Sequence, residues 1–202
     1  MLKYLKVYMA NIEKVKQLRE ETGVSFADCK KALEEAKGDI EKAKEILRKW
    51  GRELAGKKSE REAKEGIVDT YLHPNKKVGV LLDIRAESDF VAKSPEFQNL
   101  AHEICLQIAA MKPLYVKPED IPEEVIHGER KIYKEQFKNS GKPKKVIDEI
   151  VEGKLKKYKE EISLLYQPWI KDEAKTIENL INEHIAKFGE NIIIKKFVRY
   201  DI

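Results

Sequence analysis

The chain has 202 residues, of which 42% are hydrophobic and 38% are charged, and its formal net charge is +4. This composition predicts one or two folded domains and excludes an intrinsically disordered chain. No apolar stretch reaches the roughly 20 residues that span a bilayer, and the N-terminus lacks a signal-peptide pattern, so we expect a cytoplasmic protein without membrane contacts. The abundant lysine and glutamate also predict a thermophilic source, because surface ion-pair networks stabilise proteins at high temperature.

Positive charge is concentrated near the N-terminus. Residues 1–64 hold 17 Lys and Arg against 12 Asp and Glu, a net charge of +5, whereas residues 65–202 hold 23 against 24, a net charge of −1. The positive N-terminal part could bind nucleic acid. Acidic residues are interleaved with the basic ones, however, and this pattern favours a helical surface that faces solvent. A nucleic-acid-binding adaptor is therefore one alternative function, and its binding would weaken steeply with salt.

The first part of the chain predicts three short helices that glycines separate. Apolar residues recur at helical spacing, and Gly23 and Gly38 interrupt the pattern. Ser25 and Asp39 follow these glycines and are the expected N-caps of the second and third helices. The third helix is expected to end near Gly51. A module of this size has a thin core, which favours an adaptor over a catalytic body.

The hydrophobic period changes after residue 65. Residues 52–65 are polar and lysine-rich, and indicate a linker or a loosely held helix. GIVDTYLH, PNKK and VGVLLDIRA then predict two antiparallel strands joined by a tight connection. Four apolar residues of the second strand alternate onto one face: Val78, Val80, Leu82 and Ile84.

The remaining sequence predicts helices and one closing strand. Ser94 and Pro95 fit the N-cap and first residue of a helix whose apolar stripe packs on the hairpin. Further helices are expected at about residues 122–138, 143–163 and 174–188, with NSGKP between the first two. NIIIKKFVRYDI reads as the third strand. The fold class is therefore α+β, a three-helix module followed by a small three-stranded antiparallel sheet packed by helices.

These elements suggest a division into two domains. We expect an N-terminal module over residues 1–51, of which residues 1–10 are an extension, then a linker over residues 52–65 and a core over residues 66–202. The core is the only part long enough to bury a sizeable hydrophobic interior.

Motifs for intrinsic catalysis are missing from the sequence. It contains neither a GxxxxGKS nor a GxGxxG phosphate loop, and its four histidines lack metal-ligand spacing. Cys29 and Cys105 stand far apart without a CxxC partner, and we expect both to be buried small hydrophobes. We therefore expect no cofactor, no metal and no bond-making catalysis. A small-molecule enzyme with a polar pocket is the second alternative function.

An acidic residue and an aromatic one stand together between the hairpin and the long helix, in AESDFVAKSPEF. From these residues alone, Ser88 reads as a helix N-cap and Phe90 or Val91 as a core residue. The competing interpretation is that Asp89 and Phe90 reach another molecule.

Several motifs of the sequence, taken in their order along the chain, resemble those of a known protein family. TGVSFADCKKALEEAKGDIEKA, GIVDTYLH, ESDFVA and LLYQPWIKD resemble the bacterial elongation factor Ts family in its short form, from about residue 11 to the end. The resemblance implies a guanine-nucleotide exchange factor that binds elongation factor Tu with GDP, displaces magnesium and promotes GDP release, so that GTP can bind. It also implies a homodimer that binds two GTPase molecules, without direct nucleic-acid or membrane binding.

The family pattern Thr-Asp-Phe-Val matches Ser88, Asp89, Phe90 and Val91. In the family the Asp-Phe pair is a wedge beside the magnesium site of the GTPase. The resemblance therefore favours a reaching role for Asp89 and Phe90 and leaves Val91 mainly as support. Serine keeps the hydroxyl of threonine and can cap a helix in the same way, so we expect Ser88 to play the part of the family's threonine.

The family's N-terminal module is similar to ubiquitin-associated domains and docks on the nucleotide-binding domain of the GTPase. The resemblance makes Val24, Lys30 and Lys31 candidates for this docking surface. Without it, the two lysines would be read as solvated residues of a helix surface. We expect that removal of residues 1–51 weakens partner binding and leaves the core folded.

Three other positions depart from the family pattern. Ala86 stands where some short members carry cysteine, so a disulfide-linked dimer built on that position is excluded. Trp169 replaces the usual phenylalanine and keeps the aromatic bulk. Tyr166 stands where the family pattern has an acidic residue, which puts the contacts around that position in doubt.

Overall fold

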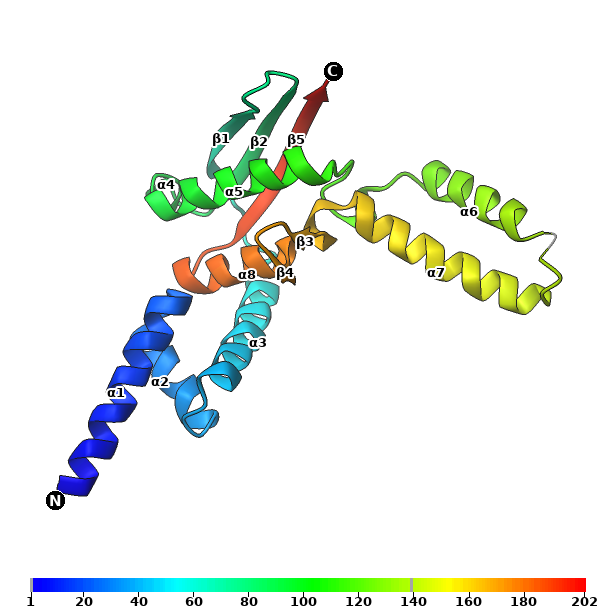
Figure 1. Cartoon of the computed structure of the whole chain (residues 1–202). Helices are drawn as coiled ribbons and strands as arrows, with labels where there is room; N and C mark the ends of the chain where they lie inside the picture. Colours follow the sequence, from blue (N-terminus) through cyan, green and yellow to red (C-terminus); the bar gives the residue numbers. More distant parts are fainter. Residues whose placement is uncertain (1, 139) are drawn as a thin grey trace. The chain divides into compact units, whose positions relative to one another are not determined.

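The computed structural model describes residues 2–138 and 140–202, with side chains from residue 12 onward; Met1 and Asn139, the latter in the predicted NSGKP connection, lie outside the described residues. The chain forms two compact units, each built from separate segments (Figure 1). One unit contains the chain up to Gly66 together with Arg85–Ser94 and Asn179–Ile193. The other contains Ile67–Ile84, Pro95–Glu178 and Ile194–Ile202. The first unit thus takes segments from both the predicted module and the predicted core.

Three helices open the first unit, as predicted: α1 (Leu2–Thr22), α2 (Phe26–Glu35) and α3 (Ile40–Lys58). The two predicted N-caps are confirmed, because the side chains of Ser25 and Asp39 accept hydrogen bonds from backbone N–H groups, each at 3.1 Å. The buried core of the module consists of small and aliphatic residues: Val15, Leu18, Cys29, Ala32, Leu33, Ala36, Ala43 and Leu47.

The predicted end of the third helix was wrong, because α3 continues through Gly51 to Lys58. Gly51 is buried against α8 (Ile177–Phe188). A Cβ atom at this position would lie 3.4 Å from the carbonyl oxygen of Asn182 and 3.5 Å from the Cβ of Ala186. The glycine therefore allows two helices to approach closely, and it does not end one. Residues 52–58, read as a linker or a loose helix, are a packed continuation of α3.

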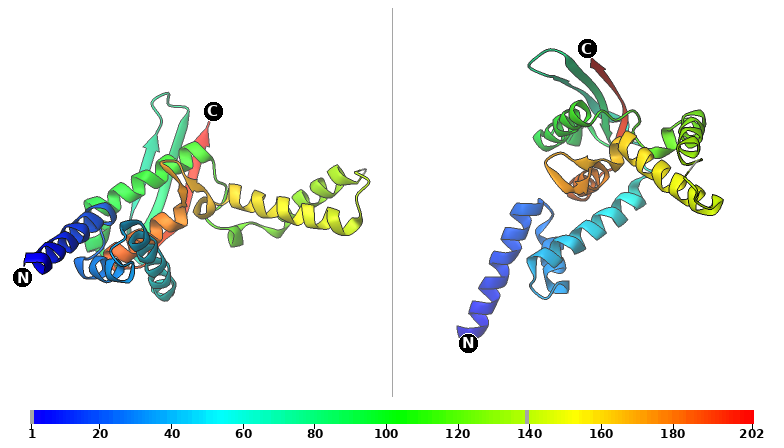
Figure 2. Two further views of the ribbon diagram at one scale, coloured as in Figure 1. Left: turned by 60° about the horizontal axis from the view of Figure 1, so that its bottom comes forward. Right: turned by 45° about the vertical axis from the view of Figure 1, so that its right-hand side comes forward.

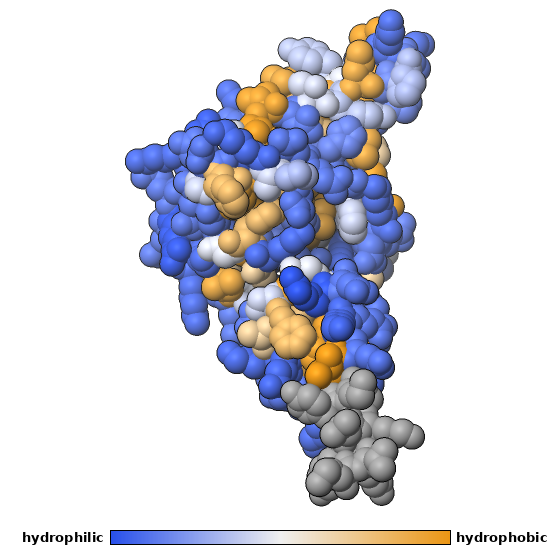
Figure 3. Space-filling model, turned by 90° about the vertical axis from the view of Figure 1, so that its left-hand side faces the viewer, coloured by the Kyte–Doolittle hydropathy of each residue, from blue (hydrophilic) through white to orange (hydrophobic). Residues whose placement is uncertain are grey.

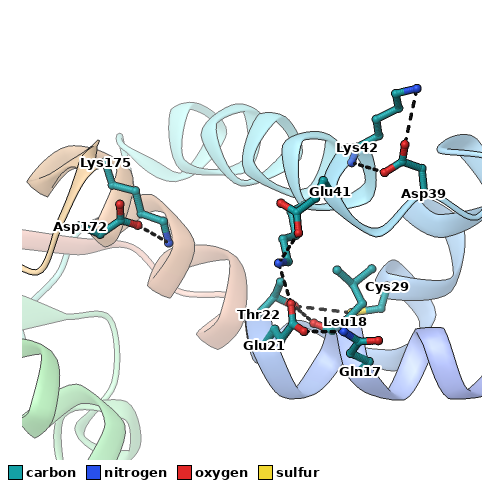
Figure 4. A network of polar contacts seen from close by, with 11 residues as sticks. Gln17, Leu18, Glu21, Thr22, Cys29, Asp39, Glu41, Lys42, Asp172 and Lys175 are labelled. Atoms are coloured by element: carbon teal, nitrogen blue, oxygen red, sulfur yellow. Dashed lines mark hydrogen bonds and ion pairs between the residues drawn. The ribbon is translucent and has the colours of Figure 1, made fainter.

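Polar contacts tie the three helices together (Figure 4). The Thr22 hydroxyl donates to the carbonyl oxygen of Leu18 at 2.6 Å and lies 3.8 Å from the sulfur of Cys29. Lys44 on α3 contacts Glu21 on α1 at 2.6 Å and its helical neighbour Glu41 at 2.8 Å. These hydrogen bonds from Lys44 lower the pKa of Glu21 and raise that of the lysine itself.

The central sheet has the order β1-β2-β5, with β1 (Glu65–Leu72), β2 (Val78–Ala86) and β5 (Ile192–Asp201). The antiparallel sheet and its hairpin are confirmed. The long helix α5 (Pro95–Met111) begins at the predicted proline and covers one face of the sheet (Figures 1 and 2). Cys105 on this helix is fully buried, and burial raises the pKa of its thiol to about 12.

The remaining helices were also predicted within a few residues. α6 (Glu123–Phe137) and α7 (Lys144–Ile162) form an antiparallel hairpin (Figure 2). An Arg130–Glu152 ion pair joins the middle of the two helices, and Lys134 lies 3.5 Å from Asp148 nearer to their connection. The two helices pack against each other, and the buried residues Val151 and Leu155 lie on α7, whereas Ile132 of α6 is half exposed. Two short 3-10 turns flank the hairpin: η1 (Pro118–Asp120) and η2 (Leu164–Tyr166).

A small two-stranded sheet was missed: β3 (Pro168–Trp169) and β4 (Asp172–Thr176). Because β4 takes these residues, α8 starts at Ile177 and not near residue 174. Gln107 of α5 fixes this sheet, since its side chain donates to the Pro168 carbonyl at 3.0 Å and accepts from the Ile170 N–H at 2.9 Å. A buried glutamine carries no periodic signal, so sequence patterning did not reveal this contact.

Candidate partner-binding site

The short helix α4 (Asp89–Ala92) lies directly after β2 and carries the predicted wedge residues. Ser88 is its N-cap, with extended backbone angles and a hydroxyl that accepts from the Val91 N–H at 3.3 Å. The Lys93 N–H closes the turn on the Asp89 carbonyl at 3.0 Å. Serine at the cap followed by an acidic first residue favours this single turn, because both groups complement the N–H groups of a helix start.

The residues of this turn differ in how far they are buried. Val91 is 5% exposed and Ala92 is 3% exposed, so this side of α4 belongs to the core. Phe90 is 83% exposed, and among the described large hydrophobic residues only Ile202, at 96%, exposes a greater fraction. Of the two residues read as core candidates from the sequence alone, Val91 is buried and Phe90 is not.

Asp89 is also exposed and is held by its own helix. Its Oδ2 accepts a hydrogen bond from the Lys93 ammonium at 2.7 Å, an ion pair between residues four apart. This hydrogen bond lowers the pKa of the Asp89 carboxyl, so the group is ionised at neutral pH. The turn therefore presents a phenyl ring beside a negative charge to the surroundings.

Ser88 also contacts the loop between α8 and β5. Its backbone N–H donates to Glu190 Oε2 at 3.0 Å, and its hydroxyl donates to Glu190 Oε1 at 2.7 Å. The neighbouring Glu87 accepts from the N–H of Asn191 at 2.6 Å. Sequence reasoning missed Glu190 and Asn191, because both lie more than 100 residues from their partners and no local pattern marks them.

The three-helix module has a groove of about 470 Å³ between α1 and α2. Its lining mixes apolar and charged side chains: Ile12, Val15, Phe26, Lys30, Leu33, Glu34, Lys37 and Gly38. Phe26 is 42% exposed there. Figure 3 shows such apolar areas, in orange, within a mostly hydrophilic surface.

The three predicted docking residues differ in position. Lys30 lines the groove and lies 3.9 Å from Glu34 on the next turn. Lys31 is exposed but does not line it, and Val24 packs partly against the module core. Phe26 was not selected from the sequence, because its helical spacing matches that of the core residues. Only the folded module shows that Phe26 is 42% exposed and lines the groove.

The described part of the chain meets neither the needs of a metal site, in its acidic, histidine and cysteine side chains, nor the needs of a membrane span, in its helices. No group of three or more His, Cys, Asp or Glu residues there is arranged to hold a metal ion. Among the same residues, no helix is both long enough and apolar enough to cross a membrane. The described residues do expose large apolar side chains, among them Phe90 on α4 and Phe26 in the groove of the three-helix module.

The chain resembles known proteins over nearly its whole length. The sequence profile of the family described as elongation factor TS matches residues 6–202. Elongation factor Ts of Thermosipho melanesiensis is 52% identical over 194 residues, which cover 96% of this chain and 99% of that protein. Elongation factor Ts of Coprothermobacter proteolyticus is 52% identical over 188 residues, 93% of this chain and 95% of that protein. The chain belongs to the elongation factor Ts family.

Proposed function

We propose that this protein is a guanine-nucleotide exchange factor of translation that binds elongation factor Tu with GDP, displaces magnesium and promotes GDP release so that GTP can bind. The observation that carries the proposal is the exposed Asp89–Phe90 pair on a capped helix, at the positions of the family's Asp-Phe wedge. An aromatic residue exposed to this degree contributes little to the fold of the free protein. It can fill an apolar slot of a partner, where such anchors dominate binding.

Asp89 and Phe90 meet the physical requirements for nucleotide exchange. A GTPase holds GDP through magnesium, backbone N–H groups around the phosphates and base contacts that reinforce one another. An exchange factor must bind the nucleotide-free state more tightly than the loaded state, because only differential affinity shifts an equilibrium. Phe90 can separate elements that hold the metal, and the ionised Asp89 can disturb the octahedral shell that magnesium demands. No bond-making residue is needed.

The N-terminal module supplies a second contact in this proposal. Lys30 and Phe26 line one groove, in which apolar side chains stand beside two lysines and one glutamate. Val24 and Lys31 flank this surface on the same module. We propose that the groove docks on the nucleotide-binding domain of the GTPase and sets affinity, whereas α4 sets the rate of release.

The sheet supports the proposed homodimer, which would bind two GTPase molecules. Arg199 of β5 donates to the Ala109 carbonyl of α5 at 3.3 Å, so the alternate residues of β5 point to the opposite face. Exposed apolar side chains gather on that opposite face from all three strands: Val68, Leu72, Leu81, Val198 and Tyr200. Such a patch suits a self-complementary interface. Leu81→Lys should turn the dimer into monomers in sedimentation experiments.

Release kinetics test the exchange proposal. Elongation factor Tu loaded with fluorescent GDP is mixed with excess GDP, with and without this protein, and release is followed by stopped flow. We expect strong acceleration in millimolar magnesium and a much smaller additional effect after chelation, because chelation already removes the metal. Equal acceleration in both conditions would contradict magnesium displacement, and no acceleration would contradict exchange activity.

Localisation and partner range complete the proposal. We propose a cytoplasmic protein that uses no cofactor and binds neither nucleic acid nor membranes directly. A pull-down from cell extract should retain one abundant GTPase of about 40 to 45 kDa, the size that the family resemblance implies. Retention of nucleic acid that is lost steeply with salt would favour the adaptor alternative instead.

A further inference from the structure

Glu190 joins the helix that carries the wedge to a distant part of the chain. Both oxygens of its carboxylate are used, one by the N–H and the other by the hydroxyl of Ser88, at 3.0 and 2.7 Å. The Ser88 hydroxyl in turn accepts from the Val91 N–H at 3.3 Å. The hydroxyl proton is thus directed at Glu190 while a lone pair caps α4. Hydrogen bonds to a carboxylate are stronger than those between neutral groups.

In a second set of contacts the acceptor lies before α4 and the donor lies on the α8–β5 loop. Glu87 accepts from the Asn191 N–H at 2.6 Å and lies 3.6 Å from Arg61 Nη1. The side-chain amide of Asn191 donates to the Arg61 carbonyl at 2.8 Å. We call these residues the clasp: Arg61, Glu87, Ser88, Glu190 and Asn191. Glu87 accepts the N–H of the residue after Glu190, and Glu190 accepts the N–H of the residue after Glu87, so the two segments of the clasp hold each other.

The clasp is placed by a turn at the end of α8. Gly189 has a φ of +71°, a left-handed conformation that favours glycine, and its carbonyl accepts a hydrogen bond from Lys58 at the end of α3. Asn191 follows at 3% exposure. The α8–β5 turn, the end of α3 and the start of α4 are therefore fixed to one another within the first unit.

α4 needs such support. A single helical turn is unstable on its own, because fixing its backbone costs more than its few hydrogen bonds return. Its buried side chains, Val91 and Ala92, are small and anchor only one side. Its backbone hydrogen bonds are local, from Ala92 to Ser88 and from Lys93 to Asp89. The hydrogen bonds between Ser88 and Glu190 reach a distant segment, and they hold the N-cap.

We propose that Glu190 is a positioning residue for exchange: it locks Ser88 and thereby pre-orients Phe90 and Asp89 before the partner arrives. The inference rests on the proposed exchange function, and it adds a role for a residue on a distant loop. Pre-orientation raises the rate of release at saturation, because Phe90 and Asp89 stand in the productive geometry in a larger share of the complexes. The groove of the N-terminal module is not part of the clasp, so affinity is set independently.

The first test is the substitution Glu190→Ala in the full chain, assayed by GDP release from elongation factor Tu over a range of concentrations. We expect the release rate at saturation to fall on the order of tenfold, as misplaced positioning groups commonly cause, with the half-saturating concentration nearly unchanged. Glu190→Gln keeps one acceptor oxygen, so its saturated release rate should lie between those of the parent protein and Glu190→Ala. The matched control is Glu183→Ala on α8, which removes a carboxylate paired with Arg48 at 3.7 Å and should leave the rate unchanged.

A double-mutant cycle shows whether Glu190 acts through the wedge. In the Phe90→Ala background, Glu190→Ala should have little further effect on the saturated rate, because the side chain that it positions is gone. Fully additive losses would overturn the positioning role. If Phe90→Ala slows release and Glu190→Ala does not, this inference fails while the proposed function stands. If Phe90→Ala itself changes nothing, the wedge proposal fails.

Hydrogen exchange gives a readout that does not depend on the GTPase. In the free protein, Glu190→Ala should increase amide exchange within residues 88–94 and leave α2 and α5 protected as in the parent chain. Unchanged protection of residues 88–94 would overturn the inference. If Glu190→Ala fails to fold, the same comparison is made with Glu190→Gln, for which a smaller increase confined to this turn is expected.

Discussion

The short helix α4 and the N-terminal groove both expose an aromatic residue, and they do so in different ways. Phe90 is 83% exposed on one turn, and the hydrogen bonds at its N-cap come from a loop more than 100 residues away. Phe26 is 42% exposed at the start of a longer helix, in a groove whose core is built from local sequence. A single rigid projection suits the opening of a partner, whereas a broad groove suits attachment to it. Rate and affinity should therefore respond to different substitutions.

The largest effect is expected from the core of the N-terminal module. Leu18→Ala removes a fully buried side chain from the three-helix module and should lower its free energy of unfolding by about 3 kcal/mol. Affinity for the GTPase should fall with it, because the groove rests on this core. Thermal unfolding and calorimetric titration measure the two quantities. A destabilised module with unchanged affinity would show that the groove is not the attachment site.

The structure of α3 changes what we expect when residues 1–51 are removed. The sequence suggested that the core would stay folded, but this cut divides α3 and removes part of its packing on α8. Truncation should therefore also lower the melting temperature of the remaining chain. Point substitutions in the groove are the cleaner test of docking.

Phe90→Ala is expected to have the next largest effect. The saturated rate of GDP release should fall about 30-fold or more, equivalent to about 2 kcal/mol for an aromatic anchor. Stability should not change, because the side chain is largely exposed in the free protein. Ile132→Ala on α6, which truncates a side chain that is 51% exposed, is the matched control. Equal effects of the two substitutions would contradict a specific role of α4.

Lys30→Glu should separate affinity from rate. Reversing the charge in the lining of the groove is expected to weaken binding about tenfold, or about 1.4 kcal/mol, with the saturated release rate unchanged. Lys31→Glu is the matched control, because Lys31 lies on the same helix outside the groove lining. Titration calorimetry at two salt concentrations measures the affinity of both variants, and stopped-flow release of GDP measures their saturated rates. If Lys31→Glu weakened binding more than Lys30→Glu, the docking surface would have to be moved around α2.

The smallest effect concerns the ion pair on α4. Because the hydrogen bond from Lys93 lowers the pKa of Asp89 below its ordinary value of 3.8, the pair stabilises the turn at and above that pH, and this contribution is lost as the pH falls through the lowered pKa. Lys93→Met should return the pKa of Asp89 toward 3.8. Carboxyl chemical shifts followed by NMR measure this change. A pKa that stays low in the variant would assign the shift to the backbone of α4.

Local patterns in the sequence determined most of the elements. Helical spacing, the caps Ser25 and Asp39, and the alternation in β2 predicted the helices and the antiparallel sheet, because these signals lie within one element. Gly51 misled the prediction of one helix end, since a glycine that ends a helix and one that admits a neighbouring helix look alike in sequence. The sheet of β3 and β4 was missed because its anchor, Gln107, is a buried polar residue far along the chain.

For the candidate site, the sequence by itself supplied the family motif and with it Ser88, Asp89, Phe90 and Val91. Only the tertiary structure decided that Val91 is buried while Phe90 is exposed, because burial depends on what packs around the turn. It also brought Glu190 and Asn191 to the start of α4, across more than 100 residues. Motifs record which residues stand side by side in the chain, and hydrogen bonds between distant segments arise only when the chain has folded.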